Sequence, residues 1–178
     1  MKISAHLNAI EADLITIQAD LDIKDIKVSP GRFDASEITR RSFKAPALRI
    51  AFLGAPRTVA QADETRKYDC AFAVFILTDG KTRALEGVDI AEAVAAHIEL
   101  NRFSAITETG VPKNIRMDAL YSTHIDDKGI SLYSVSWTQS IKIGKSCALG
   151  AATDENAVIP PGTPLVQDID ITQLPDGV

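Results

Sequence analysis

The sequence predicts an α/β domain of the α+β type, with a mixed, mainly antiparallel sheet of about four to five strands covered by two main helices. Three observations support this fold class. Two segments have apolar residues at helical spacing, five segments have strand-like composition or alternation, and a turn-rich stretch joins the last two of these as a hairpin. The predicted domain covers residues 1–149, and residues 150–178 form an extended C-terminal arm.

Apolar residues at helical spacing mark the two helices. The first helix begins the chain, with an apolar stripe at alternating intervals of four and three formed by Ile3, Leu7, Ile10, Leu14, Ile17 and Leu21. This pattern is too short for a coiled coil, so it predicts a helix packed on a sheet. The second helix is expected at residues 85–102, with an apolar face made of Val88, Ala91, Val94, Ala95 and Ile98. Its small alanines let it lie close to the sheet.

Three strands are predicted before the second helix. Residues 26–31 form a short strand-like piece, and residues 47–56 and 68–80 are rich in β-branched and aromatic residues and end in Gly or Pro. Because residues 68–80 are apolar on both alternating faces, this strand is predicted to be central and covered on each side. The polar connection at residues 57–67 is predicted to be a long hairpin loop that projects from the sheet.

The remaining two strands form the predicted hairpin. Residues 114–126 and 129–143 alternate at period two, and the turn between them ends in Gly129, which suits a positive φ angle. One face of the first strand holds Ile115, Met117, Ala119 and Tyr121, and one face of the second holds Tyr133, Val135, Trp137 and Ile141. The outer positions of the second strand are small and polar: Ser131, Ser134, Ser136, Thr138 and Ser140. Trp137 is therefore predicted to be buried between the sheet and a helix.

Charge and composition exclude several classes of function. The 178-residue chain has a net charge of −5, and its last 29 residues hold five carboxylates and no Lys or Arg. Residues 1–149 are consequently neutral, which argues against nucleic acid as the main ligand. No run approaches the roughly 18 apolar residues of a membrane helix, and the start of the chain lacks a signal peptide, so a cytoplasmic protein without a membrane partner is expected. Cys70 and Cys147 lie far apart, and Cys70 is expected in the core.

The strongest candidate for a reaction site is the stretch around His124. In a strand, His124 and Asp126 point to one face, and Ser122 shares that face, so a small hydrolase is one alternative. The competing interpretation is a solvated turn in which the side chains of Asp126 and Asp127 form hydrogen bonds with the local backbone. His6 and His97 are expected to be ordinary surface residues. Because dinucleotide, P-loop, zincin and hydrolase motifs are absent, no catalytic residue, cofactor or metal site is predicted.

Basic and aliphatic residues outside the predicted core are the candidates for contacts with other subunits. The basic candidates lie in two polar segments and are Arg40, Arg41, Lys44, Arg57, Arg66 and Lys67. In the C-terminal arm, Pro and Gly exclude a long helix, while Val166, Ile169 and Ile171 alternate enough to add an edge strand. The arm is expected to dock on its own sheet or on an adjacent subunit, where its carboxylates meet a basic loop. A solvated terminus is the alternative.

Four segments, taken in order, resemble one family of virion proteins. They are "APALRIAFLGA", "RKYDCAFAVFILT", "ALEGVDIAEAVAAHI" and "LYSTHIDDKGISLYSVSWTQS". Residues 1–145 are similar in their order of elements to the small tail-terminator or tail-completion proteins of Mu-like tailed bacteriophages. The resemblance implies a non-catalytic homo-oligomeric ring, commonly a hexamer, whose partners are the tail tube protein and a head–tail connector protein.

The resemblance also implies a place of action and leaves one part of the chain unmatched. A protein of this family is assembled in the cytoplasm of the host bacterium and sits at the head-proximal end of the tail. There it stops polymerisation of the tube and provides the surface for head docking. A head-completion or connector protein would share the ring, so that role stays open. The arm from residue 150 onward departs from the family pattern.

Overall fold

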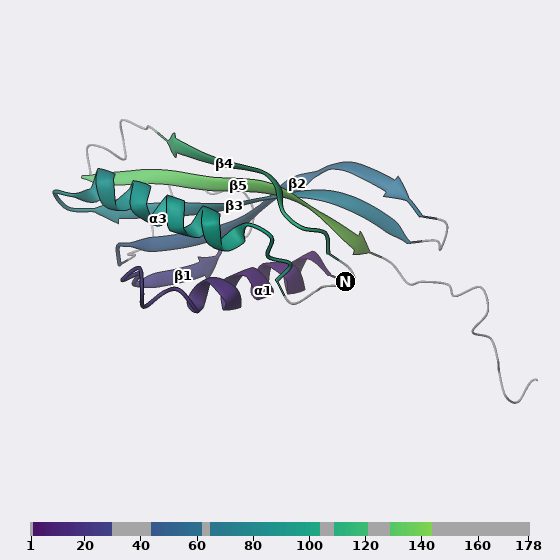
Figure 1. Ribbon diagram of the computed structural model, residues 1–178, viewed down its shortest axis with the longest axis horizontal. Helices are drawn as coiled ribbons and strands as arrows, with labels where there is room; N and C mark the ends of the chain where they lie inside the picture. The colour runs from purple at the N-terminus through teal and green to yellow at the C-terminus, as the bar shows by residue number, and fades with distance from the viewer. Residues whose placement is uncertain (1, 30–43, 62–64, 104–108, 121–128, 144–178) are drawn as a thin grey trace, which may run out of the picture. The chain divides into compact units, whose positions relative to one another are not determined.

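The computed structural model describes residues 2–29, 44–61, 65–103, 109–120 and 129–143, all within the compact unit formed by residues 1–147 (Figure 1). The predicted C-terminal arm and the turn at residues 126–128 lie outside the described residues. Within these ranges the elements are α1 (Ile3–Ile15), β1 (Asp25–Val28), β2 (Ala47–Ala60), β3 (Arg66–Asp79), α3 (Arg83–Ile98), β4 (Lys113–Leu120) and β5 (Ile130–Ile143).

The five strands form one mixed sheet in the order β1-β2-β3-β5-β4. β1 runs parallel to β2, and every other neighbouring pair is antiparallel. Both helices lie on the same face of this sheet (Figure 1). The predicted α+β class, with a mainly antiparallel sheet and two helices, is therefore confirmed.

β3 is the central strand, as its two apolar faces predict. Cys70, Phe72, Val74 and Ile76 belong to the main core beneath the helices. On the opposite face, Leu77 forms a smaller apolar cluster with Ala47 of β2 and Leu132 of β5. Burial raises the pKa of the Cys70 thiol to about 11, with a smaller contribution from the nearby Asp69 carboxylate. Cys70 is thus a neutral core residue, as expected.

The first helix is shorter than its apolar stripe. His6, Ile10 and Leu14 are buried, and the helix ends at Ile15. The Thr16 hydroxyl donates to the backbone carbonyl of Asp13, a local bond that competes with continuation of a helix. Ile17 and Leu21 still pack against the core from the turns that follow. The stripe therefore predicted the buried face correctly but overestimated the length of the helix.

The buried face of α3 is rotated relative to the prediction. Gly87 and Ile90 are buried, whereas Val88 is 48% exposed. The Tyr133 ring occupies the space that a β-carbon at position 87 would need, and its hydroxyl donates to the Ala84 carbonyl at 3.0 Å. Glycine at position 87 therefore lets the helix approach β5 closely. A hydropathy pattern does not count glycine as apolar, so it selected Val88 instead.

The β4–β5 hairpin is confirmed, and its core face is the predicted one. Trp137 is 2% exposed and packs against Phe72 and Phe103, with ring centroids 5.7 and 6.2 Å away. Two positions differ from the prediction. Ser134 is buried on the face away from the helices, and Met117 is 56% exposed because β4 is the edge strand.

The predicted loop at residues 57–67 is mostly paired strand, so that prediction is wrong. Arg57, Thr58, Val59 and Ala60 pair in register with residues 69 to 66 of β3, and β5 pairs with the same part of β3 from the other side. We call residues 57–60 and 66–69 the hairpin extension, because here β2 and β3 run on past both helices (Figure 1). Tyr68 packs against the main core, but most of the segment is left uncovered by the described helices and is exposed, and it is ordered by its backbone pairing.

Candidate functional site

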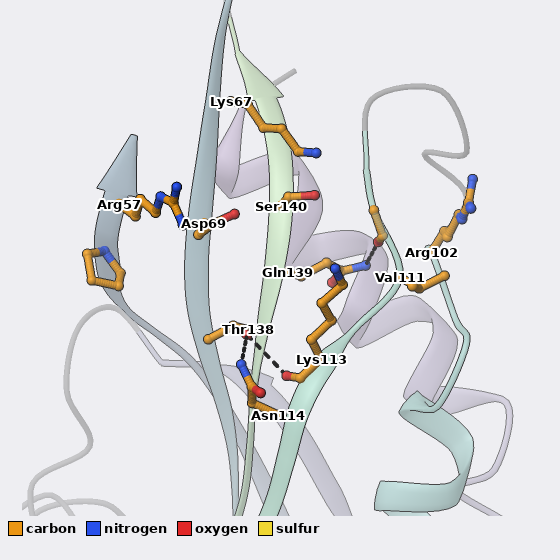
Figure 2. A pocket seen from close by; sticks show the side chains of 12 residues that line it. Arg57, Lys67, Asp69, Arg102, Val111, Lys113, Asn114, Thr138, Gln139 and Ser140 are labelled. Atoms are coloured by element: carbon orange, nitrogen blue, oxygen red, sulfur yellow. Dashed lines mark hydrogen bonds between the residues drawn. The ribbon is translucent and has the colours of Figure 1, made fainter. Parts of the chain in front are cut away.

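An open groove with a volume of about 490 Å³ lies at the base of the hairpin extension (Figure 2). Its charged lining residues are Arg57, Lys67, Asp69, Arg102 and Lys113, and polar side chains between them come from Asn114, Thr138 and Ser140. These residues belong to β2, β3, β4, β5 and the segment that follows α3. The groove is thus assembled by the tertiary fold from segments far apart in the sequence.

The register of the sheet positions the groove residues. Asp69 pairs with Arg57 on one side and Ser140 on the other. Side chains of a strand alternate between faces, and Tyr68 and Cys70 pack into the helix-covered core. Lys67 and Asp69 therefore lie on the face away from the helices. Figure 2 shows the side chains of Lys67 and Lys113 extending toward β5.

Hydrogen bonds fix the β4 side of the groove. The Asn114 side-chain amide donates to the Thr138 hydroxyl at 3.0 Å, and that hydroxyl donates to the Lys113 carbonyl at 3.2 Å (Figure 2). The Gln139 side-chain amide donates to the Gly110 carbonyl at 2.8 Å. Asn114 has a φ of +54° at an irregularity in the β4–β5 register, a conformation that Asn tolerates well. The position of Lys113 is consequently set by the β4 bulge.

The groove is strongly basic for a chain with a net charge of −5. Of the residues described by the structure, four cationic side chains and one carboxylate line it. Among the residues the structure describes, Arg57, Lys67 and Lys113 are exposed and take part in no ion pair. Converging unpaired cations attract anionic groups such as carboxylates, most strongly at low ionic strength. The arrangement suits binding of an acidic partner.

The hydroxyl, amide and basic side chains of the groove determine what it can bind. The Thr138 hydroxyl is engaged with the backbone of β4, and the described lining contains no histidine. Within the described ranges, no group of three or more His, Cys, Asp or Glu could hold a metal ion. The cationic and amide side chains that line the groove support electrostatic recognition of a ligand.

The structure brings together some of the predicted interface residues and separates others. Arg57 and Lys67 meet in the groove. Arg66 is exposed but points to the opposite face from its neighbour Lys67, and exposed Lys44 precedes β2 at the end of that strand opposite to Arg57. The remaining candidates lie outside the described residues: Arg40, Arg41, Val166, Ile169 and Ile171, together with Ser122, His124, Asp126 and Asp127.

Sequence reasoning missed Arg102, Lys113 and Asn114 as groove residues. Lys113 and Asn114 stand at the start of a predicted strand, and nothing local distinguishes them from other polar residues there. Their pairing with Thr138 depends on a register that a bulge shifts. Their charge makes Arg102 and Lys113 possible candidates, but only the tertiary fold brings them into the same groove as Lys67.

His6 is buried, which corrects the expectation that it lies on the surface. Its ring packs between Phe72 and Phe103, and its Nε2 lies 3.0 Å from the Gln139 side-chain oxygen. The Gln139 amide nitrogen donates to backbone carbonyls, so its oxygen accepts from the Trp137 indole and from His6. His6 thus carries its proton on Nε2, and its buried Nδ1 has no partner among the described residues.

The second corrected histidine joins the two helices. His97 of α3 and Asn101 contact the same Asp13 carboxylate oxygen of α1, at 2.6 and 2.7 Å. The Asp13 and His97 side chains are partly exposed. This cluster lies between helices on the main core face, and no described nucleophilic side chain bonds to it. Its evident role is to hold α1 against α3.

Stability is expected to decrease as the pH falls through the usual histidine pKa of about 6.5 and below it. Burial lowers the pKa of His6 despite its bond to Gln139, whereas the unfolded chain keeps the usual value of about 6.5. Below that value the unfolded state binds a proton that the folded state does not, so unfolding is favoured. Urea unfolding at several pH values should show this loss, and the His6→Phe variant should show a weaker one. An unchanged pH dependence in His6→Phe would contradict the assignment.

The chain matches no protein family and no curated protein sequence. None of the described helices is long and apolar enough to cross a membrane. The features of this chain that bear on its function are the groove, the hairpin extension and the sequence.

Proposed function

We propose that this chain is a non-catalytic structural subunit that forms a homo-oligomeric ring, and that its role is to terminate the tail of a bacteriophage. In this role the ring caps the head-proximal end of the tail tube, stops addition of further tube protein and offers its other face to a head–tail connector protein. The particular role and the ring of six subunits come from the family resemblance of residues 1–145.

The hairpin extension is the observation that supports this proposal. The last five residues of β2, Pro56–Ala60, are all exposed, although the strand begins with a buried half. Val59 and Arg66 project from a sheet that the described helices leave uncovered at this end (Figure 1). Hairpins without a core contribute little stability to their own domain. An ordered strand pair that buries so little in its own subunit is suited to contact a neighbour.

A ring of such subunits stops polymerisation by geometry. A heterologous contact, in which one patch meets a different patch on the next copy, closes into a ring when the rotation between copies is right. One face of the ring must then imitate the next layer of the tube, while the other face must not accept tube protein. Termination therefore needs two unlike faces and no turnover of substrate.

Particles assembled without this protein are expected to carry tails longer than the normal length. Electron microscopy of lysates with and without the gene would measure the tail-length distribution, and supplying the protein in trans should restore it. A connector protein would give a different result, since tails of normal length would then accumulate apart from the heads. Normal tails on intact particles would contradict both roles.

A further inference from the structure

We propose that the basic groove binds the acidic C-terminal segment, residues 150–178, of a second copy of this chain. The inference concerns the occupant of the groove and does not depend on the phage role. It joins two features that the sequence separates: converging cations from β2, β3 and β4, and a terminal segment with five carboxylates and no basic residue.

Charge complementarity is the first argument for this occupant. The groove presents Arg57, Lys67 and Lys113 without ion-pair partners among the described residues, beside a single carboxylate, Asp69. The acidic positions of the segment are Asp154, Glu155, Asp168, Asp170 and Asp176. Since residues 1–149 are neutral as a whole, this segment accounts for the net charge of −5 and is an electrostatic match to the groove.

Length and connectivity make the contact between copies feasible. β5 ends at Ile143, which pairs with Arg66 at the outer end of the hairpin extension. The 29 residues from Gly150 to Val178 span up to about 100 Å when fully extended. A segment of this length can reach the groove of a second copy of the chain.

The lining of the groove favours an acidic peptide over a nucleic acid. Proteins that bind single-stranded nucleic acid combine a basic groove with aromatic side chains on which the bases stack. None of the described residues that line this groove is aromatic, so the described lining offers no platform on which bases could stack. Asn114, Thr138 and Ser140 instead offer amide and hydroxyl groups that can bond peptide groups of an extended segment.

Binding of a fluorescent peptide of residues 150–178 to the full-length protein would test the proposal. The receptor is a full chain whose own five carboxylates in this segment are changed to Asn or Gln, so that it does not compete. Fluorescence anisotropy should show saturable binding that weakens as NaCl is raised. The double variant Lys67→Glu with Lys113→Glu should bind at least tenfold more weakly, whereas Arg66→Glu with Lys81→Glu should bind as before.

The control pair has the same change of charge and keeps the groove intact. Arg66 adjoins Lys67 but points to the other face, and Lys81 follows the opposite end of β3. A peptide with all five carboxylates neutralised tests the same contact without altering the protein. Its affinity should fall as much as the affinity of the acidic peptide falls for the Lys67→Glu, Lys113→Glu variant. Equal affinity of the groove variant and the control pair, or of the neutral and acidic peptides, would overturn the proposal.

Competition with other anions, and comparison with the tail-length experiment, distinguish this proposal from other ligands and from the proposed phage role. If a single-stranded oligonucleotide or inorganic phosphate displaces the peptide at lower concentration than the unlabelled peptide does, the groove is an anion site of another class and the proposal is wrong. Peptide binding with normal tail lengths in particles lacking the protein would keep this inference and remove the proposed function. Overlong tails without peptide binding would do the reverse.

Discussion

Replacing Trp137 with alanine is expected to lower the free energy of unfolding by about 3–5 kcal/mol. The indole is almost completely buried and lies between Phe72 of β3 and Phe103. Its N–H donates to the Gln139 side-chain oxygen at 3.3 Å, the same oxygen that His6 contacts. The substitution therefore opens a cavity under both helices and removes one bond from the buried polar cluster.

Urea unfolding followed by far-ultraviolet circular dichroism measures this loss, because the variant lacks the only tryptophan of the chain and cannot be followed by its fluorescence. Leu85→Ala is the matched control: Leu85 is mostly exposed on α3, and its truncation should change the free energy of unfolding by about 0.5 kcal/mol or less. A Trp137→Ala protein as stable as this control would mean that the helix-covered face of β5 is assigned wrongly.

Shortening the hairpin extension is expected to abolish ring assembly while leaving the domain folded. Residues Ala60–Arg66 would be replaced by Asn-Gly, a two-residue turn that joins Val59 to its partner Lys67 in the existing register. The change keeps Arg57 and Lys67, so the basic groove is retained. Since most of the removed described residues are exposed, the free energy of unfolding should change by about 1 kcal/mol or less.

Negative-stain electron microscopy of isolated tail tubes mixed with the variant would count capped tube ends. The original protein and Lys81→Ala, an exposed change at the opposite end of β3, should both cap the tubes. Caps formed equally well by the shortened protein would show that the outer end of the extension is dispensable for assembly.

Patterns within single elements predicted much of the fold. The two apolar faces of residues 68–80 identified the central strand, and the alternation through Trp137 identified the core face of β5. Both predictions needed only the period-two geometry of strands. The apolar stripes of the helices also predicted most of their buried faces. They did not predict the burial of Gly87, which depends on its small size and not on its hydropathy.

Contacts between distant segments could not be predicted in the same way. The connection at residues 57–67 is mostly polar and has no periodicity, which predicts a loop, yet the partners of residues 57–60 on β3 are fixed by the antiparallel ladder. His6 is buried because of Gln139, which lies 133 residues away. The groove needs both Lys113 and Lys67 in its lining, which depends on β5 lying between β3 and β4. Each of these features follows from sheet order and register, not from local composition.

Electron cryomicroscopy of the head-proximal ends of assembled tails would show whether this subunit forms the proposed terminating ring. We expect a closed ring of the subunit, with the hairpin extension of each copy in contact with its neighbour or with the last layer of tube protein. Light scattering of the protein alone is less decisive, because closure of the ring can require the tube. A single copy of the subunit in the assembled particle, or a tube end without any ring of it, would contradict the proposed function.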